Sequence, residues 1–133
     1  MEVGTYKAST FLILREFLLL KNNSLESLTI DPNRHISDEF LKSLNIDFQQ
    51  ATLADIRKSY DLIFIDGDHK YEAVKKDYNL AVKLNPKYIM FHNIVDKYCP
   101  GVVRFWGEIK RDHKDYKEIT DCKDLMGFGI IEL

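Results

Sequence analysis

Six residues, Tyr60-Asp-Leu-Ile-Phe-Ile65, decide the fold, and the polar run Asp66-Gly-Asp-His69 follows them directly. A near-continuous apolar run of this length is typical of a strand that is buried on both faces of a parallel sheet. Tyr88–Phe91 has the same character and stops at His92-Asn93. We therefore expect two buried strands, each with polar residues at its carboxyl end.

Helix-like segments alternate with the strand-like ones along the chain. In Tyr71–Leu84 the apolar residues recur at helical spacing, and Asn85-Pro86 ends the segment. Alternation of this kind predicts a parallel sheet with helices on both faces, and a final pair of strands adds an antiparallel edge. The other helices are expected at Ser9–Lys21 with Ser9 or Thr10 as cap, at Ile36–Leu44 and at Val102–Lys110, with a turn or small helix at Thr52–Lys58. The other strands are expected at Met1–Gly4, Leu28–Asp31, Ile46–Gln50, Tyr116–Thr120 and Phe128–Leu133, the last two joined by a hairpin at Asp121–Gly127.

Composition predicts one ordinary globular domain over residues 1–133. Apolar residues make up 45 % and charged residues 30 %, and the formal net charge of −2 gives no field that attracts nucleic acid or an acidic membrane. The two cysteines, Cys99 and Cys122, are too few for a disulfide framework and indicate free thiols in a reducing compartment. Phe11–Leu20 is too short, and with Arg15 and Glu16 too charged, to span a bilayer. We expect a soluble cytoplasmic protein without nucleic acid or a membrane as partner.

Polar and flexible residues stand at nearly every predicted strand end, which is where open α/β sheets bind ligands. Asp31 ends the second strand, where a carboxylate can accept two hydrogen bonds from a ribose diol. The alternative for Asp31 is a structural role as a helix cap or as a turn residue before Pro32. Together these ends describe a ligand-binding rim made of Gly4–Ser9, Asp31, Gln50–Thr52, Asp66–His69 and His92-Asn93.

Gly4 allows the backbone to turn sharply from the first strand into the first helix. Lys7 and Ala8 stand where a glycine-rich loop would carry further glycines. The chain therefore lacks a G-x-G-x-x-G cradle for pyrophosphate, which argues against a dinucleotide cofactor and is compatible with a ligand that has no phosphates.

The run Asp66-Gly67-Asp68-His69 places three ionisable groups within four residues, and Gly67 permits a tight backbone there. Burying so many charges without a ligand, cation or partner would be costly. The alternative is a solvated turn in which Asp68 caps the next helix.

Adjacent strand ends lie about 5 Å apart, so Asp66, His92 and Asn93 could converge on one ligand or metal. Mg²⁺ prefers oxygen ligands, and this set would suit Mn²⁺ or Zn²⁺ better. The alternative is that His92 is an ordinary histidine satisfied by its neighbours.

The segment Tyr60–His69, followed by Tyr71-Glu72, resembles the fourth-strand motif of a branch of class I S-adenosylmethionine-dependent methyltransferases. Relatives of macrocin O-methyltransferase and proteins labelled cephalosporin hydroxylases share this F-I-D-G-D-H-x-Y-E pattern. Further segments resemble the same branch in the same order: Glu2–Thr5, Thr29–Pro32, Leu84–Pro86, Phe91–Ile94, Gly101–Trp106 and Met126–Glu132. The resemblance covers nearly the whole chain and implies a Rossmann-like, doubly wound, mostly parallel seven-stranded sheet with a C-terminal antiparallel hairpin.

The resemblance also implies S-adenosylmethionine as cofactor, with a divalent metal (Mg²⁺ or Mn²⁺) as a further candidate, and a hydroxyl of a small metabolite or sugar as methyl acceptor. The preferred general base is His69, with His92 as second choice, and Asp66 would lie near the reactive end. The implied cofactor contacts are Glu2 and the backbone around Gly4 for the methionine part, Asp31 for the ribose, and Ala51 and Thr52 near the adenine.

Three features depart from the pattern of these enzymes. Lys7 and Ala8 replace a looser first motif, and Asn93 replaces an expected Asp, which removes a carboxylate from any metal site. The chain also begins inside the first strand, without the N-terminal helices that usually cover the substrate. We therefore expect a minimal or truncated version, or a homo-oligomer in which a neighbour supplies the lid.

Two other functions compete with methyl transfer. A binding module that keeps the fold but acts through partners without turnover is favoured by the reduced first motif. A dehydrogenase is disfavoured by the missing glycine fingerprint.

Overall fold

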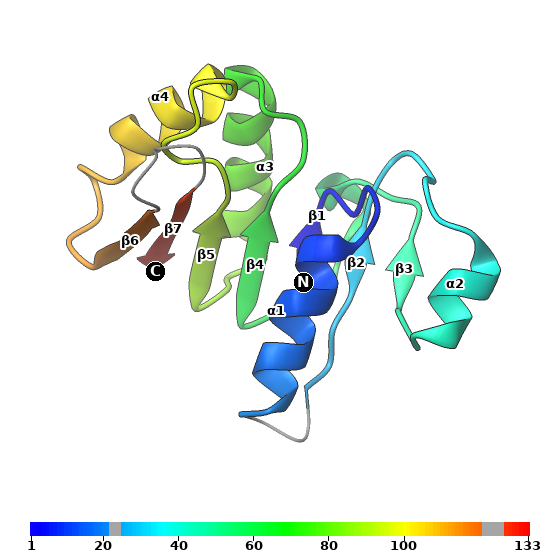
Figure 1. The fold of residues 1–133 in the computed structure, drawn as a ribbon. Coiled ribbons are helices and arrows are strands. Elements are labelled where there is room, and N and C mark those ends of the chain that lie inside the picture. Colours follow the sequence, from blue (N-terminus) through cyan, green and yellow to red (C-terminus); the bar gives the residue numbers. More distant parts are fainter. Residues whose placement is uncertain (22–24, 121–126) are drawn as a thin grey trace.

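The computed structural model describes residues 1–21, 25–120 and 127–133, and its centre is a seven-stranded sheet (Figure 1). The strand order is β3-β2-β1-β4-β5-β7-β6, with β1 to β5 parallel and β7 antiparallel to both β5 and β6. This confirms the predicted fold class. The strands are β1 (Glu2–Val3), β2 (Thr29–Ile30), β3 (Phe48–Gln49), β4 (Leu62–Ile65), β5 (Tyr88–Phe91), β6 (Tyr116–Thr120) and β7 (Gly127–Glu132).

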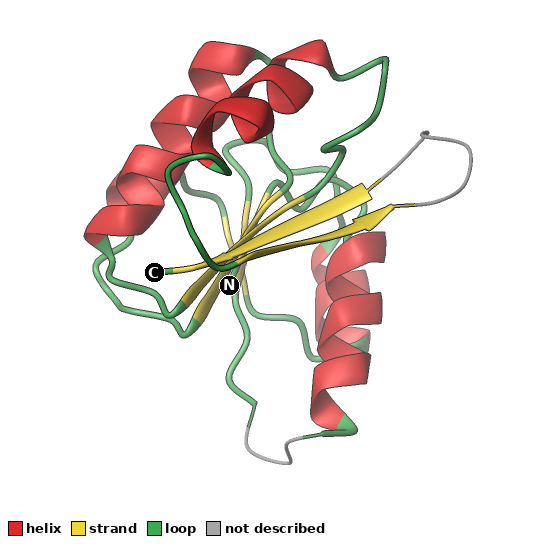
Figure 2. Cartoon of the chain, turned by 90° about the vertical axis from the view of Figure 1, so that its left-hand side faces the viewer, coloured by secondary structure: helices red, strands yellow, loops and turns green. Residues whose placement is uncertain are grey.

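Helices cover the two faces of the sheet unequally. Figure 2 shows α3 and α4 on one face and α1 on the other, and Figure 1 shows α2 beside β3 at the edge. The helices are α1 (Ser9–Leu19), α2 (Asp38–Ser43), the 3₁₀ helix η1 (Leu53–Asp55), α3 (Tyr71–Lys83) and α4 (Pro100–Ile109). In the part of the chain that the structure describes, no helix is both long enough and apolar enough to cross a bilayer.

The main core lies between the sheet and the helices α3 and α4. Its largest fully buried members include Trp106 of α4 and Phe91 of β5, whose ring centroids are 5.7 Å apart. On the α1 face, by contrast, the buried apolar cluster is small: Ala8, Phe11, Leu41 and Ile46.

Several sequence expectations about α1 are wrong. The residue before the helix is Ala8, in the left-handed conformation (φ 59°), and neither Ser9 nor Thr10 caps it. The helix ends at Leu19 rather than Lys21, and of its apolar residues only Phe11 is buried. Helical periodicity alone cannot tell whether another element covers an apolar stripe.

The remaining boundaries shift by a few residues. α4 begins at Pro100 rather than Val102, because proline in the first turn of a helix loses no hydrogen bond there. The predicted hairpin connection 121–127 lies, apart from Gly127, outside the described residues.

The strand order reverses between β1 and β4, since β2 and β3 follow on one side and β5 on the other. In open α/β sheets, the crevice outside the carboxyl ends of the strands at such a reversal is the usual ligand site.

Candidate functional site

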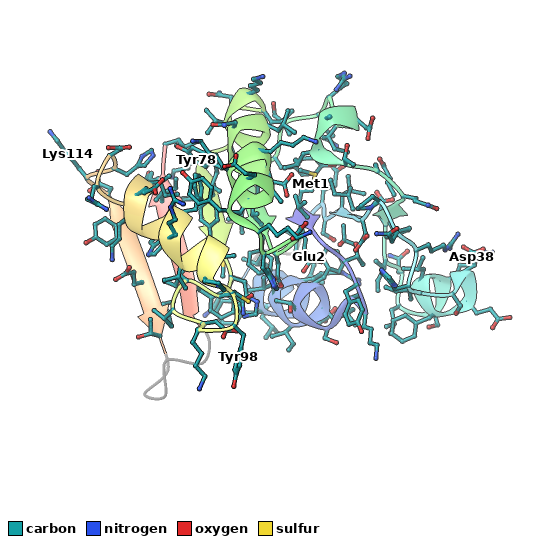
Figure 3. All side chains as sticks on the ribbon, turned by 90° about the horizontal axis from the view of Figure 1, so that it is seen from above. Met1, Glu2, Asp38, Tyr78, Tyr98 and Lys114 are labelled. Atoms are coloured by element: carbon teal, nitrogen blue, oxygen red, sulfur yellow. The ribbon has the colours of Figure 1, made fainter. Side chains whose placement is uncertain are left out.

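A cleft of about 710 Å³ opens at the carboxyl ends of β1, β2 and β4, at the reversal of strand order. In Figure 3, which looks at the molecule from above, Glu2 lies near its middle and Asp38 of α2 at its margin. The sequence missed several further lining residues, among them His35, Lys76 and Asp77. All nine residues to which the sequence analysis gave a role in catalysis, cofactor binding or metal binding line this cleft: Glu2, Gly4, Asp31, Ala51, Thr52, Asp66, His69, His92 and Asn93.

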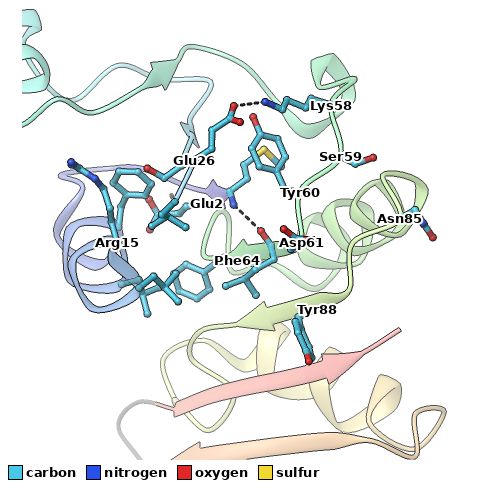
Figure 4. A pocket seen from close by; sticks show the side chains of 17 residues that line it. Glu2, Arg15, Glu26, Lys58, Ser59, Tyr60, Asp61, Phe64, Asn85 and Tyr88 are labelled. Atoms are coloured by element: carbon cyan, nitrogen blue, oxygen red, sulfur yellow. Dashed lines mark hydrogen bonds and ion pairs between the residues drawn. The ribbon is translucent and has the colours of Figure 1, made fainter. Parts of the chain in front are cut away.

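A second cavity, of about 620 Å³, lies elsewhere, between α1 and the sheet (Figure 4). Its walls include Phe64, Tyr60 and Tyr88, and Lys58 and Glu26 form an ion pair at its rim. Glu2 is the one predicted site residue that also lines it. Because the other predicted groups lie in the larger cleft, we assign the chemistry to that cleft.

The loop after β1 depends on Gly4. Gly4 has φ +96°, and a Cβ atom built there would overlap the backbone carbonyl of Asp66. The expectation that Gly67 provides the tight backbone is wrong, since a Cβ on Gly67 would meet only ordinary contacts, the nearest at 3.5 Å. The close approach of the β1 and β4 loops therefore rests on the first glycine and not on the second.

Asp31, at the end of β2, is buried and accepts two backbone hydrogen bonds. Its Oδ2 accepts from the backbone N–H of Tyr6 at 3.1 Å and its Oδ1 from that of Asn33 at 2.8 Å. Asp31 therefore has the structural role in a turn, and each of its carboxylate oxygens keeps a further lone pair for a ligand. Its role in binding a ribose stays a prediction.

Glu2 is almost completely buried, with 3 % of its surface exposed. The pKa of its carboxyl is raised to about 8, mainly by burial and also by the charges of Asp66 and Asp31, against the hydrogen bond from Thr29. The Oγ1 of Thr29 donates to Oε2 of Glu2 at 2.7 Å and lies 2.7 Å from Oγ1 of Thr5. The carboxyl is therefore largely protonated at pH 7, and we expect it to meet a ligand as a neutral group.

Thr52 lies at the cleft wall beside η1. Its backbone N–H and its hydroxyl both donate to Oδ2 of Asp55, at 2.9 and 2.8 Å. Its predicted position near an adenine stays a prediction.

The end of β4 meets the end of β5 through Asp66 and His92. Oδ1 of Asp66 lies 3.0 Å from Nδ1 of His92 and 3.6 Å from Nε2 of His69, so one carboxylate lies between two imidazoles. Burial opposes ionisation of Asp66, but the hydrogen bonds and charges of the two histidines outweigh it and lower its pKa. The interaction with the carboxylate of Asp66 raises the pKa of His69, and burial partly opposes that shift.

A network around Asp96 supports these groups, and the sequence analysis missed it. The buried Asp96 accepts from the Nδ2 of Asn93 at 3.1 Å and from the backbone N–H of Tyr98 at 2.8 Å. The Sγ atom of Cys99 lies 3.7 Å from Oδ2 of Asp96 and 3.2 Å from Nδ1 of His69. The motif Asp96-Lys-Tyr-Cys99 before Pro100 gave no signal that a thiol would reach the site.

The metal site that the sequence suggested does not fit this geometry. Oδ1 of Asp66 and Nδ1 of His92 are hydrogen-bonded to each other at 3.0 Å, so neither atom is open to an ion. Among the described residues, no three His, Cys, Asp or Glu side chains converge to hold an ion. We therefore derive no step through a metal.

Comparison with known proteins adds independent findings. The sequence model of a family described as "Methyltransferase domain" matches residues 1–94. An uncharacterised protein of Acanthamoeba polyphaga mimivirus is 27 % identical over 146 residues, which cover 92 % of this chain. The chain spans 66 % of that relative's length.

Solved structures share the fold at low sequence identity. An O-methyltransferase from Bacillus cereus, solved in complex with SAH, has a TM-score of 0.66 and 18 % identity, and the match covers 99 % of this chain and 72 % of that one. The human methyltransferase 10 domain containing protein has a TM-score of 0.60 and 13 % identity, over 98 % of this chain and 69 % of that one.

Proposed function

Because the chain belongs to the methyltransferase domain family, we propose that it transfers the methyl group of S-adenosylmethionine to a hydroxyl oxygen of a small metabolite or sugar. The observation that carries this proposal is the convergence of the polar strand ends on one cleft at the reversal of strand order. The complex of the Bacillus cereus O-methyltransferase with SAH, the demethylated cofactor, supports the choice of cofactor.

The residues of the cleft fit such a cofactor. The cleft volume of about 710 Å³ lies within the usual range for small-molecule sites. Asp31 keeps lone pairs for the ribose hydroxyls, and the loop at Gly4 brings backbone close to where the methionine part would lie. Thr52 and Ala51 form the wall that we assign to the adenine.

When bound, S-adenosylmethionine supplies an electrophilic methyl group on a sulfonium. In the proposed reaction the acceptor oxygen forms a bond to the methyl carbon, and the carbon–sulfur bond breaks with its electron pair going to sulfur. His69 takes the hydroxyl proton at Nε2, the nitrogen that faces Asp66, and His92 is the alternative base. The walls of the cleft contribute by holding oxygen and methyl carbon in line.

The proposed base predicts a pH dependence. Because the carboxylate of Asp66 raises the pKa of His69 above its ordinary 6.5, the imidazole is mostly a free base only above that raised value. We expect turnover to increase as the pH rises through this value.

Calorimetric titration of the purified chain with S-adenosylmethionine and S-adenosylhomocysteine tests the cofactor. We expect micromolar binding, weakened about 10- to 100-fold in Asp31→Ala, because a buried acceptor for the ribose hydroxyls is lost. Asp47→Ala is the control, an exposed carboxylate outside the cleft whose side chain makes no hydrogen bond or ion pair among the described residues. Mg²⁺ or Mn²⁺ should not change the affinity.

Two outcomes would contradict the proposal. If the chain melts cooperatively but binds neither compound, it has no cofactor site. If the affinity is unchanged in Asp31→Ala, the assignment of the ribose hydroxyls to Asp31 is wrong. Tight binding without production of S-adenosylhomocysteine, across a panel of hydroxylated metabolites and sugars, would instead favour a binding module.

A further inference from the structure

Asp96 is a buried carboxylate in the loop between β5 and α4. Its two oxygens hold three groups: the amide of Asn93, the backbone N–H of Tyr98 and the thiol of Cys99. Asn93 has a left-handed backbone (φ 60°), and its own Oδ1 is buried without a hydrogen-bond partner among the described residues. The loop is therefore organised around one acceptor beneath the cleft.

The packing of α4 brings this loop against His69. A Cβ on Gly101, in the first turn of α4, would overlap the backbone of His69 and Tyr71. The glycine thus allows the helix to lie directly on the loop after β4, which leaves Sγ of Cys99 3.2 Å from Nδ1 of His69.

The direction of each hydrogen bond follows from the carboxylate, which can only accept. The amide of Asn93 must present its NH₂ group to Asp96. The single thiol proton of Cys99 has two acceptors in reach, Oδ2 of Asp96 at 3.7 Å and Nδ1 of His69 at 3.2 Å, and we assign it to the carboxylate because that acceptor is charged. Burial and the nearby Asp96 raise the pKa of Cys99 to about 11, so the thiol keeps its proton. The sulfur lone pair is then left to accept a hydrogen bond from Nδ1 of His69.

We propose that Asp96 and Cys99 are positioning residues that keep Nδ1 of His69 protonated, so that His69 exchanges protons only at Nε2. The ordered chain runs from the N–H of His69 to the sulfur of Cys99, and from its S–H to the carboxylate of Asp96. Nε2 then faces Asp66 and the cleft, at 3.6 Å from the carboxylate oxygen. The use of Nε2 as a base rests on the proposed function, whereas the proton arrangement itself does not.

Other charges around His69 act on the same equilibrium. Asp66 at the end of β4 and Asp68 in the same loop both favour a proton on the ring, as does Asp96. Asp66 lies on the Nε2 side and so favours Nε2–H in the neutral ring. Without Cys99, the neutral form of His69 should therefore carry its proton on Nε2.

Long-range ¹H–¹⁵N NMR of the ligand-free, ¹⁵N-labelled chain reads the tautomer directly, at a pH where His69 is neutral. The His69→Gln spectrum assigns its signals among the four histidines. We expect Nδ1–H in the wild type and in Cys99→Ser, since a hydroxyl both donates and accepts, and predominantly Nε2–H in Cys99→Ala. Wild-type Nε2–H would overturn the proposal without any variant, and so would an Nδ1–H form that survives in Cys99→Ala.

Failure of the proposed function leaves a different signature. If the cofactor does not bind but the tautomers follow this pattern, the proposed positioning network is supported and the proposed methyl transfer is contradicted. If the cofactor binds and turns over, kcat should fall about tenfold in Cys99→Ala, with little change in Cys99→Ser and an unchanged KM for S-adenosylmethionine. Equal losses in both variants would overturn the positioning role, because a hydroxyl can restore the chain of hydrogen bonds.

Discussion

Asp31 and Asp66 occupy equivalent places, each directly after a parallel strand, yet their surroundings differ. Asp31 accepts hydrogen bonds from two backbone N–H groups, those of Tyr6 and Asn33. Asp66 faces two imidazoles, His92 and His69. Backbone amides keep their protons at every physiological pH, whereas imidazoles gain and lose them near neutrality. The partners of a strand-end carboxylate, and not its position, therefore decide whether its surroundings change with pH.

The strand order explains this difference. At the carboxyl end of β2, Asp31 contacts the loop that follows β1 and accepts a hydrogen bond from its backbone. At the carboxyl end of β4, Asp66 contacts the side chains of His92, at the end of β5, and His69, just before α3. The loop after β1 connects the two ends, because the backbone N–H of Tyr6 donates to Asp31 and Gly4 lies close against the backbone of Asp66.

Substituting that glycine should have the largest effect, because it breaks the contact between the two ends. In Gly4→Ala, the new Cβ would overlap the carbonyl of Asp66 at a φ of +96°, so we expect a loss of about 3 kcal/mol or more in the free energy of unfolding. Gly67→Ala is the matched control and should change it by less than about 1 kcal/mol. Urea denaturation compares the two, and similar midpoints would show that the β1 loop does not need its close approach.

Glu2 lies on β1, between the strands that carry Asp31 and Asp66 at their ends. We expect its substitution to have the next largest effect. Its pKa is raised from 4.5 in the unfolded chain to about 8 in the folded one, so the folded state binds more protons between these values. Its contribution to stability is full below pH 4.5 and is lost as the pH rises to 8. Glu2→Gln cannot titrate and so does not show this loss. Relative to the wild type, its free energy of unfolding should therefore increase by on the order of 3 kcal/mol between pH 5 and pH 9.

The Met1 ammonium also titrates in this range. Burial lowers its pKa to about 6, which makes stability rise with pH between 6 and 8, against the contribution of Glu2. Because the charge of Glu2 raises the pKa of Met1, the difference between the denaturation curves of wild type and Glu2→Gln across pH reports the carboxyl together with a smaller change at Met1. Parallel curves would mean that Glu2 is ionised in the folded chain.

Much of this arrangement was predictable from the sequence. The apolar runs of β4 and β5 predict buried strands, and parallel strands bring their carboxyl ends to one edge, so the convergence of Asp66 and His92 follows. The contact of Cys99 with His69 did not follow, because it depends on the left-handed turn at Asn93 and on the packing of Gly101. Loop geometry of this kind leaves no periodic pattern in a sequence.

Three apolar residues of α1 and its C-terminal cap are exposed for a related reason. Ile13, Phe17 and Leu20 recur at helical spacing, but 71, 57 and 83 % of their surfaces are exposed. Periodicity predicts the helix correctly, while burial depends on which elements reach that face of the sheet.

The smallest expected effect tests the comparison most directly, by neutralising each carboxylate in turn. In Asp66→Asn, the pKa of His69 should fall, because its interaction with Asp66 is the largest cause of the raised value. In Asp31→Asn it should stay unchanged, since Asp31 is not among the groups that shift it. The chemical shifts of the imidazole protons, followed from pH 5 to pH 9, give both values. In Asp66→Asn, His69 would then be a weaker base that is free at lower pH. Turnover should therefore begin to rise at lower pH and reach a lower maximum. If His69 titrated alike in both variants, Asp68 and Asp96 would set its pKa, and Asp66 would be no more a proton-handling group than Asp31 is.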